Sequence, residues 1–76
     1  MALSVLFFGR LQDAAGEGER RVDYRADVAA LIDSFEAELA GALRSPKVRV
    51  AVNGAFGASA LADGDEVAFL PPVSGG

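Results

Sequence analysis

The sequence predicts an α+β domain in which one main helix packs across a mixed sheet of about five strands. Three observations predict this class. Short apolar or alternating segments typical of strands occur toward both ends of the chain. Between them, residues 28–43 repeat apolar side chains at the spacing of an amphipathic helix. Finally, 51% of the 76 residues are hydrophobic, which favours one folded domain with a modest core over a disordered chain.

The first third of the chain predicts two strands around one helical turn. Residues 3–8 are apolar on both faces and end at Gly9, so we expect this strand in the interior of the sheet. Residues 11–15 are compatible with one turn of helix, which Gly16 would end. Residues 20–24 form a more polar strand, and we therefore place it at an edge of the sheet.

The main helix is expected to begin after Asp27, because a short side-chain carboxylate suits the N-cap position. One face of the helix then carries Val28, Leu31, Ile32, Phe35, Leu39 and Leu43. Gly41 weakens the last turn. Pro46 prevents the helix from continuing, since the residue before a proline is disfavoured in the helical conformation.

The second half predicts a hairpin and a final strand. Valines alternate with other residues over 47–52, as in a half-buried strand, and the Asn-Gly pair at 53–54 suits a type I′ turn. The return strand would begin at 55–56. The Asp-Gly-Asp sequence at 63–65 predicts a second turn before a strand over 66–70. The resulting order, β-β-α-β-β-β, is that of the ubiquitin-like β-grasp.

The composition excludes several classes of function. The chain has no Cys and no His, which removes a thiolate nucleophile, a disulfide scaffold and the usual transition-metal ligands. The net charge is −4 and no basic cluster exceeds Arg20-Arg21, so we expect no nucleic-acid binding. We therefore expect no autonomous catalysis, and an acidic surface that suits a partner with a basic docking site.

The apolar run over 3–8 is too short to span a membrane. No basic residue precedes it and no small-residue cleavage site follows it, so we expect neither a signal peptide nor a membrane partner. A cytoplasmic location is the expectation that remains.

The C-terminal hexapeptide is the most informative part of the chain. It reads Pro71-Pro72-Val73-Ser74-Gly75-Gly76. We divide the chain into a domain over 1–70 and a reactive tail over 71–76, which can extend about 20 Å. Glycine lets another protein approach closely, and proline keeps the tail extended. We expect Gly76 to react in a partner's active site, and disorder from about Val73 onward; the alternative is a frayed end that happens to be glycine.

The first and last strands predict an exposed apolar face on the sheet. One face of each strand turns toward the helix, so the opposite face carries Leu6, Phe8 and Leu70. A domain with one helix cannot cover both faces. We therefore predict a partner interface that includes Phe8, Phe56 and Leu70. The alternatives are that a loop covers this face or that these are isolated surface residues.

Three segments of the chain resemble the small subunit of molybdopterin synthase, a ubiquitin-like sulfur carrier. They are Val5-Leu6-Phe7-Phe8, Ala51-Val52-Asn53-Gly54 and the whole stretch over 61–76. The last stretch is the most specific, because an acidic turn, an apolar strand, Pro-Pro and Gly-Gly follow in the family's order and spacing. Residues 16–26 add nothing to the resemblance.

The resemblance implies a sulfur-transfer chemistry centred on Gly76. A ubiquitin-activating-like adenylyltransferase would consume ATP to form an acyl-adenylate there, and a sulfur-donating enzyme would supply sulfur for a thiocarboxylate. The tail, residues 71–76, would then enter the large catalytic subunit and give its sulfur to a pterin precursor of the molybdenum cofactor. The chain itself would bind no cofactor.

The resemblance also implies how the partners bind. In this family a heterotetramer of two small and two large subunits forms, and an apolar surface at Phe8, Phe56 and Leu70 would pack on the large subunit. Asp63, Asp65 and Glu66 would either present negative charge to the adenylating enzyme or be ordinary solvated turn residues. A calcium site at this turn would need further oxygen ligands that are missing, so we expect no metal.

Other functions remain open at this point. A sulfur carrier for thiamine or cysteine biosynthesis would share the fold and the Gly-Gly end, although the Pro-Pro-Val-Ser sequence favours the pterin pathway. A ubiquitin-like modifier would instead join Gly76 to a lysine of a target protein. A pure binding module would need neither reaction.

Overall fold

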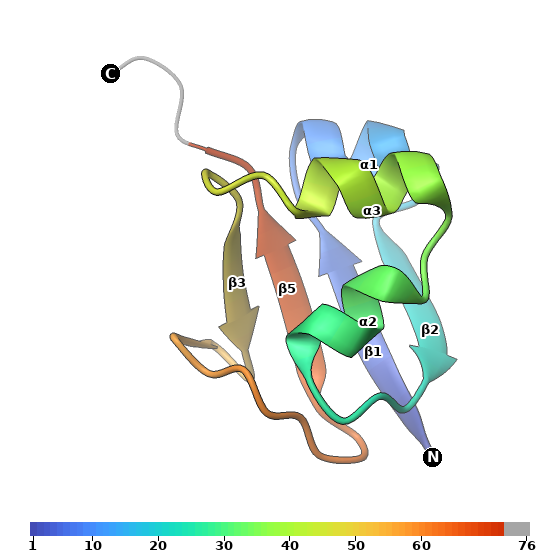
Figure 1. The fold of residues 1–76 in the computed structure, drawn as a ribbon, viewed down its shortest axis with the longest axis vertical. Coiled ribbons are helices and arrows are strands. Elements are labelled where there is room, and N and C mark those ends of the chain that lie inside the picture. Colours follow the sequence, from blue (N-terminus) through green and yellow to red (C-terminus); the bar gives the residue numbers. More distant parts are fainter. Residues whose placement is uncertain (73–76) are drawn as a thin grey trace.

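The computed structural model describes residues 1–72, and within them five strands form one mixed sheet (Figure 1). The spatial order is β2-β1-β5-β3-β4. The elements are β1 (Ala2–Phe7), α1 (Arg10–Ala15), β2 (Glu19–Asp23), α2 (Val28–Asp33), α3 (Ala37–Leu43), β3 (Arg49–Val52), β4 (Ala55–Phe56) and β5 (Glu66–Leu70). The predicted mixed sheet is confirmed, because β1 and β5 run parallel while every other pair is antiparallel.

The strands take the positions that their composition predicts. β1, which is apolar on both faces, lies between β2 and β5, and the more polar β2 is an edge strand. β5 is the central strand and pairs with β1 on one side and β3 on the other. Because β5 is central, Pro71 and Pro72, which follow it, begin at the middle of the sheet and not at one of its outer strands.

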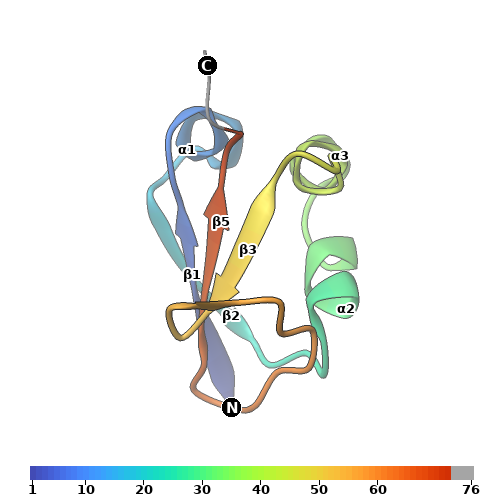
Figure 2. The same ribbon diagram turned by 90° about the vertical axis from the view of Figure 1, so that its left-hand side faces the viewer.

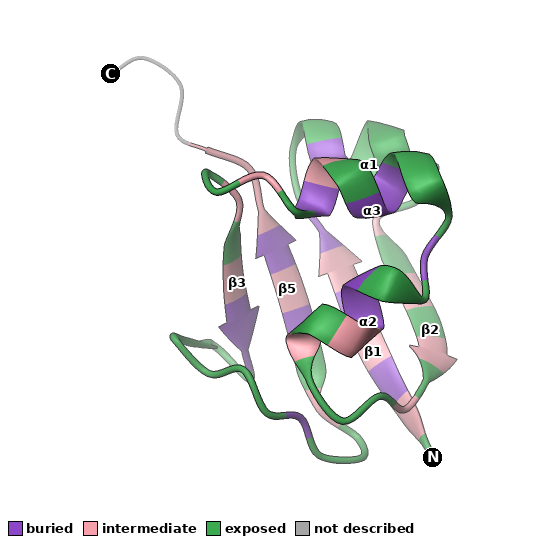
Figure 3. Ribbon diagram, in the orientation of Figure 1, coloured by how far each residue is buried: buried purple, intermediate pink, exposed green. Residues whose placement is uncertain are grey.

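Helices α2 and α3 cover one face of the sheet, and α1 lies at the end of the sheet where β1 and β5 finish (Figures 1 and 2). Buried and half-buried residues alternate along β1 and β5 (Figure 3), and the buried ones belong to the core that also contains residues of α2 and α3. Phe7 is the centre of this core: it stacks on Phe69 at 6.0 Å and meets Phe35 edge-on at 5.9 Å between ring centroids. Apolar burial between the two layers is the main source of stability.

The structure differs from the prediction in dividing the main helix. The segment over 28–43 forms two helices, α2 and α3, with a break over residues 34–36. The Ser34 hydroxyl donates a hydrogen bond to the Leu31 carbonyl at 2.6 Å, and Glu36 has an extended ψ of 150°. Serine side chains compete for backbone groups in this way and so favour helix ends. Phe35 is buried within the break, which explains why the apolar spacing continues across it.

The predicted cap and turns are confirmed. Asp27 Oδ1 accepts a hydrogen bond from the Ala30 amide at 2.8 Å and caps α2. Asn53 and Gly54 both have positive φ, at 50° and 83°, as a type I′ turn requires. Gly64, in the turn before β5, has a φ of 88°. Over residues 1–72, no helix is long and apolar enough to cross a membrane.

Candidate functional site

Pro71 and Pro72 form the tail root, which follows β5 directly. Gly9 lies against it: a Cβ added to Gly9 would come within 2.8 Å of Pro71 Cγ. Gly9 also has a φ of 56° and a ψ of −135°, a conformation that only glycine adopts readily. The start of the tail therefore rests on the junction between β1 and α1.

The reactive part of the predicted tail lies outside the described residues. This applies to Val73, Ser74, Gly75 and Gly76, and to the expected disorder from Val73 onward. The roles assigned to these residues, and the division of the chain at residue 70, stay predictions. The structure describes the domain and the first two residues of the tail, Pro71 and Pro72.

The second face of the sheet is open, as its strand pattern predicts. The register aligns Leu6, Ala68, Ala51 and Phe56 in one row across four strands. Phe56 is 53% exposed, and Phe8, at the end of β1, is 45% exposed. We call this surface the open sheet face; it consists of the exposed Phe8, Arg49 and Phe56 and the half-buried Leu6, Ala68 and Leu70, whereas Ala51 of the same row is buried.

No described element covers the open sheet face. Helices α2 and α3 lie on the opposite side (Figure 2). The loop after β4 turns toward that opposite side as well, where Ala60 pairs with Asp27 and Leu61 enters the core. Apolar surface left open in this way is typical of an interaction site. The partner role of Phe8, Phe56 and Leu70 stays a prediction.

Arg49 is a residue of this face that the sequence alone did not single out. It pairs with Leu70 in the register, and its guanidinium carbon lies 4.3 Å from the centre of the Phe56 ring. A cation over an aromatic ring is stabilised by the ring's quadrupole. The alternation in β3 could have placed Arg49 on this face, but its contact with Phe56 depends on the β3–β4 hairpin.

The acidic turn lies far from the tail root in space, although it is close in sequence. Asp65 and Glu66 stand at the start of β5 and Pro71 follows its end, so the five-residue strand separates them by roughly 17 Å. Asp63 Oδ1 accepts a hydrogen bond from the Ala2 amide at 2.7 Å. The turn is therefore joined to the start of β1.

Asp65 supports the same turn. It accepts hydrogen bonds from the Ala62 amide at 2.8 Å and from the Asn53 side-chain amide at 2.9 Å. These bonds, the one from Ala62 most strongly, lower the pKa of the Asp65 carboxyl group. Asp63 and Asp65 thus stabilise the turn through these hydrogen bonds. Contact of Asp63, Asp65 and Glu66 with an adenylating enzyme stays a prediction.

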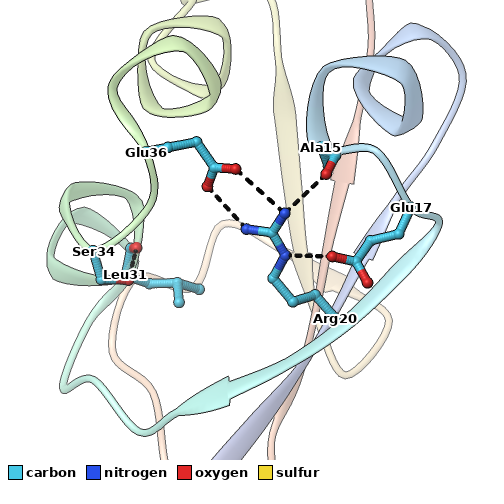
Figure 4. A network of polar contacts seen from close by, with 6 residues as sticks. All are labelled: Ala15, Glu17, Arg20, Leu31, Ser34 and Glu36. Atoms are coloured by element: carbon cyan, nitrogen blue, oxygen red, sulfur yellow. Dashed lines mark hydrogen bonds and ion pairs between the residues drawn. The ribbon is translucent and has the colours of Figure 1, made fainter.

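Arg20 forms the main polar cluster of the helix side, and the sequence alone did not single it out (Figure 4). Its guanidinium donates to the Ala15 carbonyl at 2.8 Å, to Glu17 at 2.8 Å and to Glu36 at 3.0 Å. Because Ala15 ends α1 and Glu36 lies in the break between α2 and α3, one side chain joins three elements.

The same guanidinium lies near two core aromatic rings. Its carbon is 5.4 Å from the Phe35 ring centre and 5.7 Å from that of Phe7. The hydrogen bonds with Glu36 and then Glu17 raise the pKa of Arg20, and the hydrogen bond from Arg20 lowers the pKa of Glu36. The guanidinium lies against core rings while its two carboxylate partners are exposed, and we interpret the cluster as structural because it joins separate elements.

No group of three or more His, Cys, Asp or Glu side chains that could hold a metal ion occurs in the part of the chain that is described. The features that do come together are a tail root on the central strand and an open apolar face beside it. The tail root directly follows Leu70 of that face, so the two features are adjacent.

Comparisons with known proteins identify the family. The ThiS family matches residues 5–76. The molybdopterin synthase sulfur carrier subunit of Mycobacterium tuberculosis is 37% identical over 81 residues, covering 97% of this chain and 96% of that protein.

Solved structures agree on the fold. SAMP1 from Haloferax volcanii is 32% identical with a TM-score of 0.80, and the match covers 100% of both chains. A Pyrococcus furiosus protein described as a candidate molybdopterin converting factor subunit 1 is 27% identical with a TM-score of 0.79, over 96% of this chain and 99% of that one. The chain therefore belongs to the ThiS family, as a ubiquitin-like β-grasp protein homologous to a molybdopterin synthase sulfur carrier subunit.

Proposed function

We propose that this chain is the sulfur-carrier subunit of a molybdopterin synthase and that Gly76 is its reacting residue. The observation that carries the proposal is the family match, which extends through Gly76, together with 37% identity to a sulfur carrier subunit of that synthase over nearly the full length of both chains. The structure supports it with a tail root that follows the central strand beside an open apolar face.

The chemistry begins with activation of the Gly76 carboxylate. A free carboxylate is a poor electrophile, so in the adenylating partner a carboxylate oxygen attacks the α-phosphorus of ATP and pyrophosphate leaves. Sulfur that a donor enzyme supplies at the oxidation level of sulfide then attacks the acyl carbon, and AMP leaves with a proton released, which produces a thiocarboxylate. The chain holds neither ATP nor a cofactor of its own in this scheme, and it needs no Cys to carry sulfur.

The loaded tail then acts as a mobile sulfur donor. In the catalytic subunit, the thiocarboxylate sulfur attacks a carbon of the pterin precursor and displaces an oxygen substituent. Water then cleaves the acyl–sulfur bond, which regenerates the Gly76 carboxylate and leaves the sulfur on the pterin, and two such transfers build the dithiolene that holds molybdenum. A closed partner site limits loss of the activated group to hydrolysis. Pro71 and Pro72 direct the tail, residues 73–75 insert with it into the partner, and the chain works in the cytoplasm within a heterotetramer.

The open sheet face holds the body of the chain during transfer. Phe8, Phe56 and Leu70 would pack on the catalytic subunit, because they combine exposure with position beside the tail root. Aromatic residues in such patches commonly dominate binding energy. The chain is accordingly a non-catalytic subunit, and the active site belongs to its partner.

Intact-mass spectrometry tests the carrier function. The chain is incubated with ATP, a sulfur donor and the cognate adenylating enzyme, and its mass should rise by the exchange of one oxygen for one sulfur. A variant that lacks Gly76 serves as the control and should stay unchanged while keeping its fold. An unchanged wild-type mass with an active partner enzyme would contradict the proposal.

A protein modifier is the second candidate, because the matched Haloferax volcanii structure is a small archaeal modifier protein. A modifier would form an isopeptide bond between Gly76 and a lysine of another protein. Conjugates that survive reducing denaturation and disappear without Gly76 would support this function. Reconstitution with the large subunits of the pterin, thiamine and cysteine pathways would separate the three possible carrier roles.

A further inference from the structure

A groove beside the tail root carries positive charge on an otherwise acidic chain. It lies between α1 and α3, whose positions are clear in Figure 1, and Pro72 forms part of its wall. Leu11, Ala42 and Val48 give it an apolar lining, while Arg10 and Lys47 are the charged residues that line it. The Asp13 carboxylate of α1 is not among the lining residues.

Neither cation of the groove has a carboxylate partner within residues 1–72. By contrast, two other basic side chains form ion pairs, Arg20 with Glu17 and Glu36, and Arg44 with Asp33. Arg10 and Lys47 are both exposed. The whole chain has a net charge of −4, whereas these two cations give the groove a local positive electrostatic potential.

The groove and the acidic turn lie at opposite ends of the sheet. Pro72 follows β5, whereas Asp65 and Glu66 stand at the start of that strand. A partner that receives the tail must approach Pro72, and it then covers a groove of which Pro72 is part. Burying Arg10 and Lys47 without a counter-charge is costly, so a well-matched partner supplies carboxylates there.

We propose that this groove binds an acidic segment of the partner protein that receives the tail. An apolar side chain of that segment would rest on Leu11 and Val48, and a carboxylate would meet Arg10 and Lys47. Since the groove is on the helix side, it complements the open sheet face, and the partner would hold the tail root from both sides. This inference rests on the proposed sulfur-carrier function, because it assumes a partner that receives the tail.

Charge reversal tests the groove directly. Calorimetry would measure binding of wild-type chain and of the double variant Arg10→Glu/Lys47→Glu to the cognate adenylating enzyme and to the cognate catalytic subunit. Affinity for at least one partner should fall roughly tenfold or more, and the difference should shrink at high salt. The matched control is Arg21→Glu/Arg25→Glu, which changes the same charge at exposed positions outside the groove. Equal affinities of the two double variants for both partners would overturn the inference.

Cross-linking provides a second test, because Lys47 is the single lysine of the chain. A carbodiimide joins an amine to a carboxylate with which it is in contact and forms an amide. Mass spectrometry of the complex should find Lys47 joined to an acidic partner residue. Lys47→Arg keeps the charge but lacks the amine, so it should bind normally and lose the cross-link. A complex that forms without any cross-link at Lys47 would contradict the inference.

The outcomes separate this inference from the proposed function. Sulfur loading of Gly76 without an effect of Arg10 and Lys47 would refute the groove alone. A Lys47 cross-link in a complex whose Gly76 never gains sulfur would support the groove and refute the carrier chemistry.

Discussion

Gly9 shows how a single residue determines where the tail begins. It lies between β1 and α1, and its missing side chain leaves room for Pro71, a residue from the other end of the chain. Any other residue at this position would both strain the backbone and push Pro71 away. The requirement for glycine thus arises from a tertiary contact as well as from a local turn.

We expect Gly9→Ala to displace the tail root. The added Cβ would overlap Pro71 Cγ, so the NMR chemical shifts of residues 70–72 should change. Gly57→Ala is the matched control, because Gly57 also has a positive φ, at 94°, but has open space around it. Both variants should lose stability, by roughly 1–3 kcal/mol from backbone strain. Unchanged shifts at 70–72 in Gly9→Ala would show that the proline is not held there.

Arg20 should stabilise the fold far more than Arg44. Arg20→Met leaves the Ala15 carbonyl without its donor and removes the contacts with Phe7 and Phe35, so urea unfolding should show a loss of about 1–2 kcal/mol. Arg44→Met breaks only an ion pair whose two side chains are 55% and 67% exposed, and should change stability little. Similar losses in both variants would contradict a special role for Arg20.

Among the elements, the turn before β5 has the clearest pH-dependent role. Asp65 links the Ala62 amide and the Asn53 side chain, and it thereby fastens the β3–β4 hairpin to β5. Asn53 completes the link by accepting a hydrogen bond from the Glu66 amide at 3.0 Å. Both bonds to Asp65 favour the ionised carboxylate and lower its pKa in the folded state.

The stability that Asp65 provides should therefore be lost in acid. The unfolded chain has an ordinary aspartate pKa, about 3.9, and the folded pKa lies below it. The contribution is present above the unfolded pKa and disappears as the pH falls through the folded pKa. Urea unfolding from neutral pH to below 3 should show a smaller acid loss for Asp65→Asn than for wild type. Identical pH dependences would argue that Asp65 does not ionise differently on folding.

At the scale of the whole molecule, two layers leave one sheet face without cover. The helices bury Val5, Phe7, Val67 and Phe69, and the same strand alternation leaves Leu6 and Leu70 half-buried on the other side. The elements described over residues 1–72 form these two layers and no third. The open sheet face follows from this arrangement, and a partner that packs on it would bury its apolar side chains.

Substitution at the open sheet face should affect binding more than folding. Phe8→Ser and Phe56→Ser remove side chains that are already 45% and 53% exposed, so the melting temperature should change only slightly. Affinity for the catalytic subunit should fall roughly tenfold or more, as at interface anchors. Ala29→Ser on α2, an exposed position of the covered side, is the control. Wild-type affinity in both phenylalanine variants would remove this face from the proposed interface.

The sequence by itself determined the strands, the Asp27 cap, the turns and the openness of one sheet face. These follow from local conformational preferences and from strand alternation, which operate between near neighbours in the chain. The family resemblance in the last sixteen residues belongs to this group as well. The division of the main helix escaped prediction, because Phe35 stays buried across the break and preserves the apolar spacing.

Only the tertiary structure decided which distant residues meet. Arg20 reaches Glu36 across sixteen positions, Gly9 makes room for Pro71, and Lys47 joins Arg10 at one groove. The acidic turn, adjacent to the tail in sequence, lies at the opposite end of β5. The physical reason is that such contacts depend on how strands and helices pack against one another. In addition, an extended strand separates residues that are close in sequence, because each residue adds about 3.3 Å to its length.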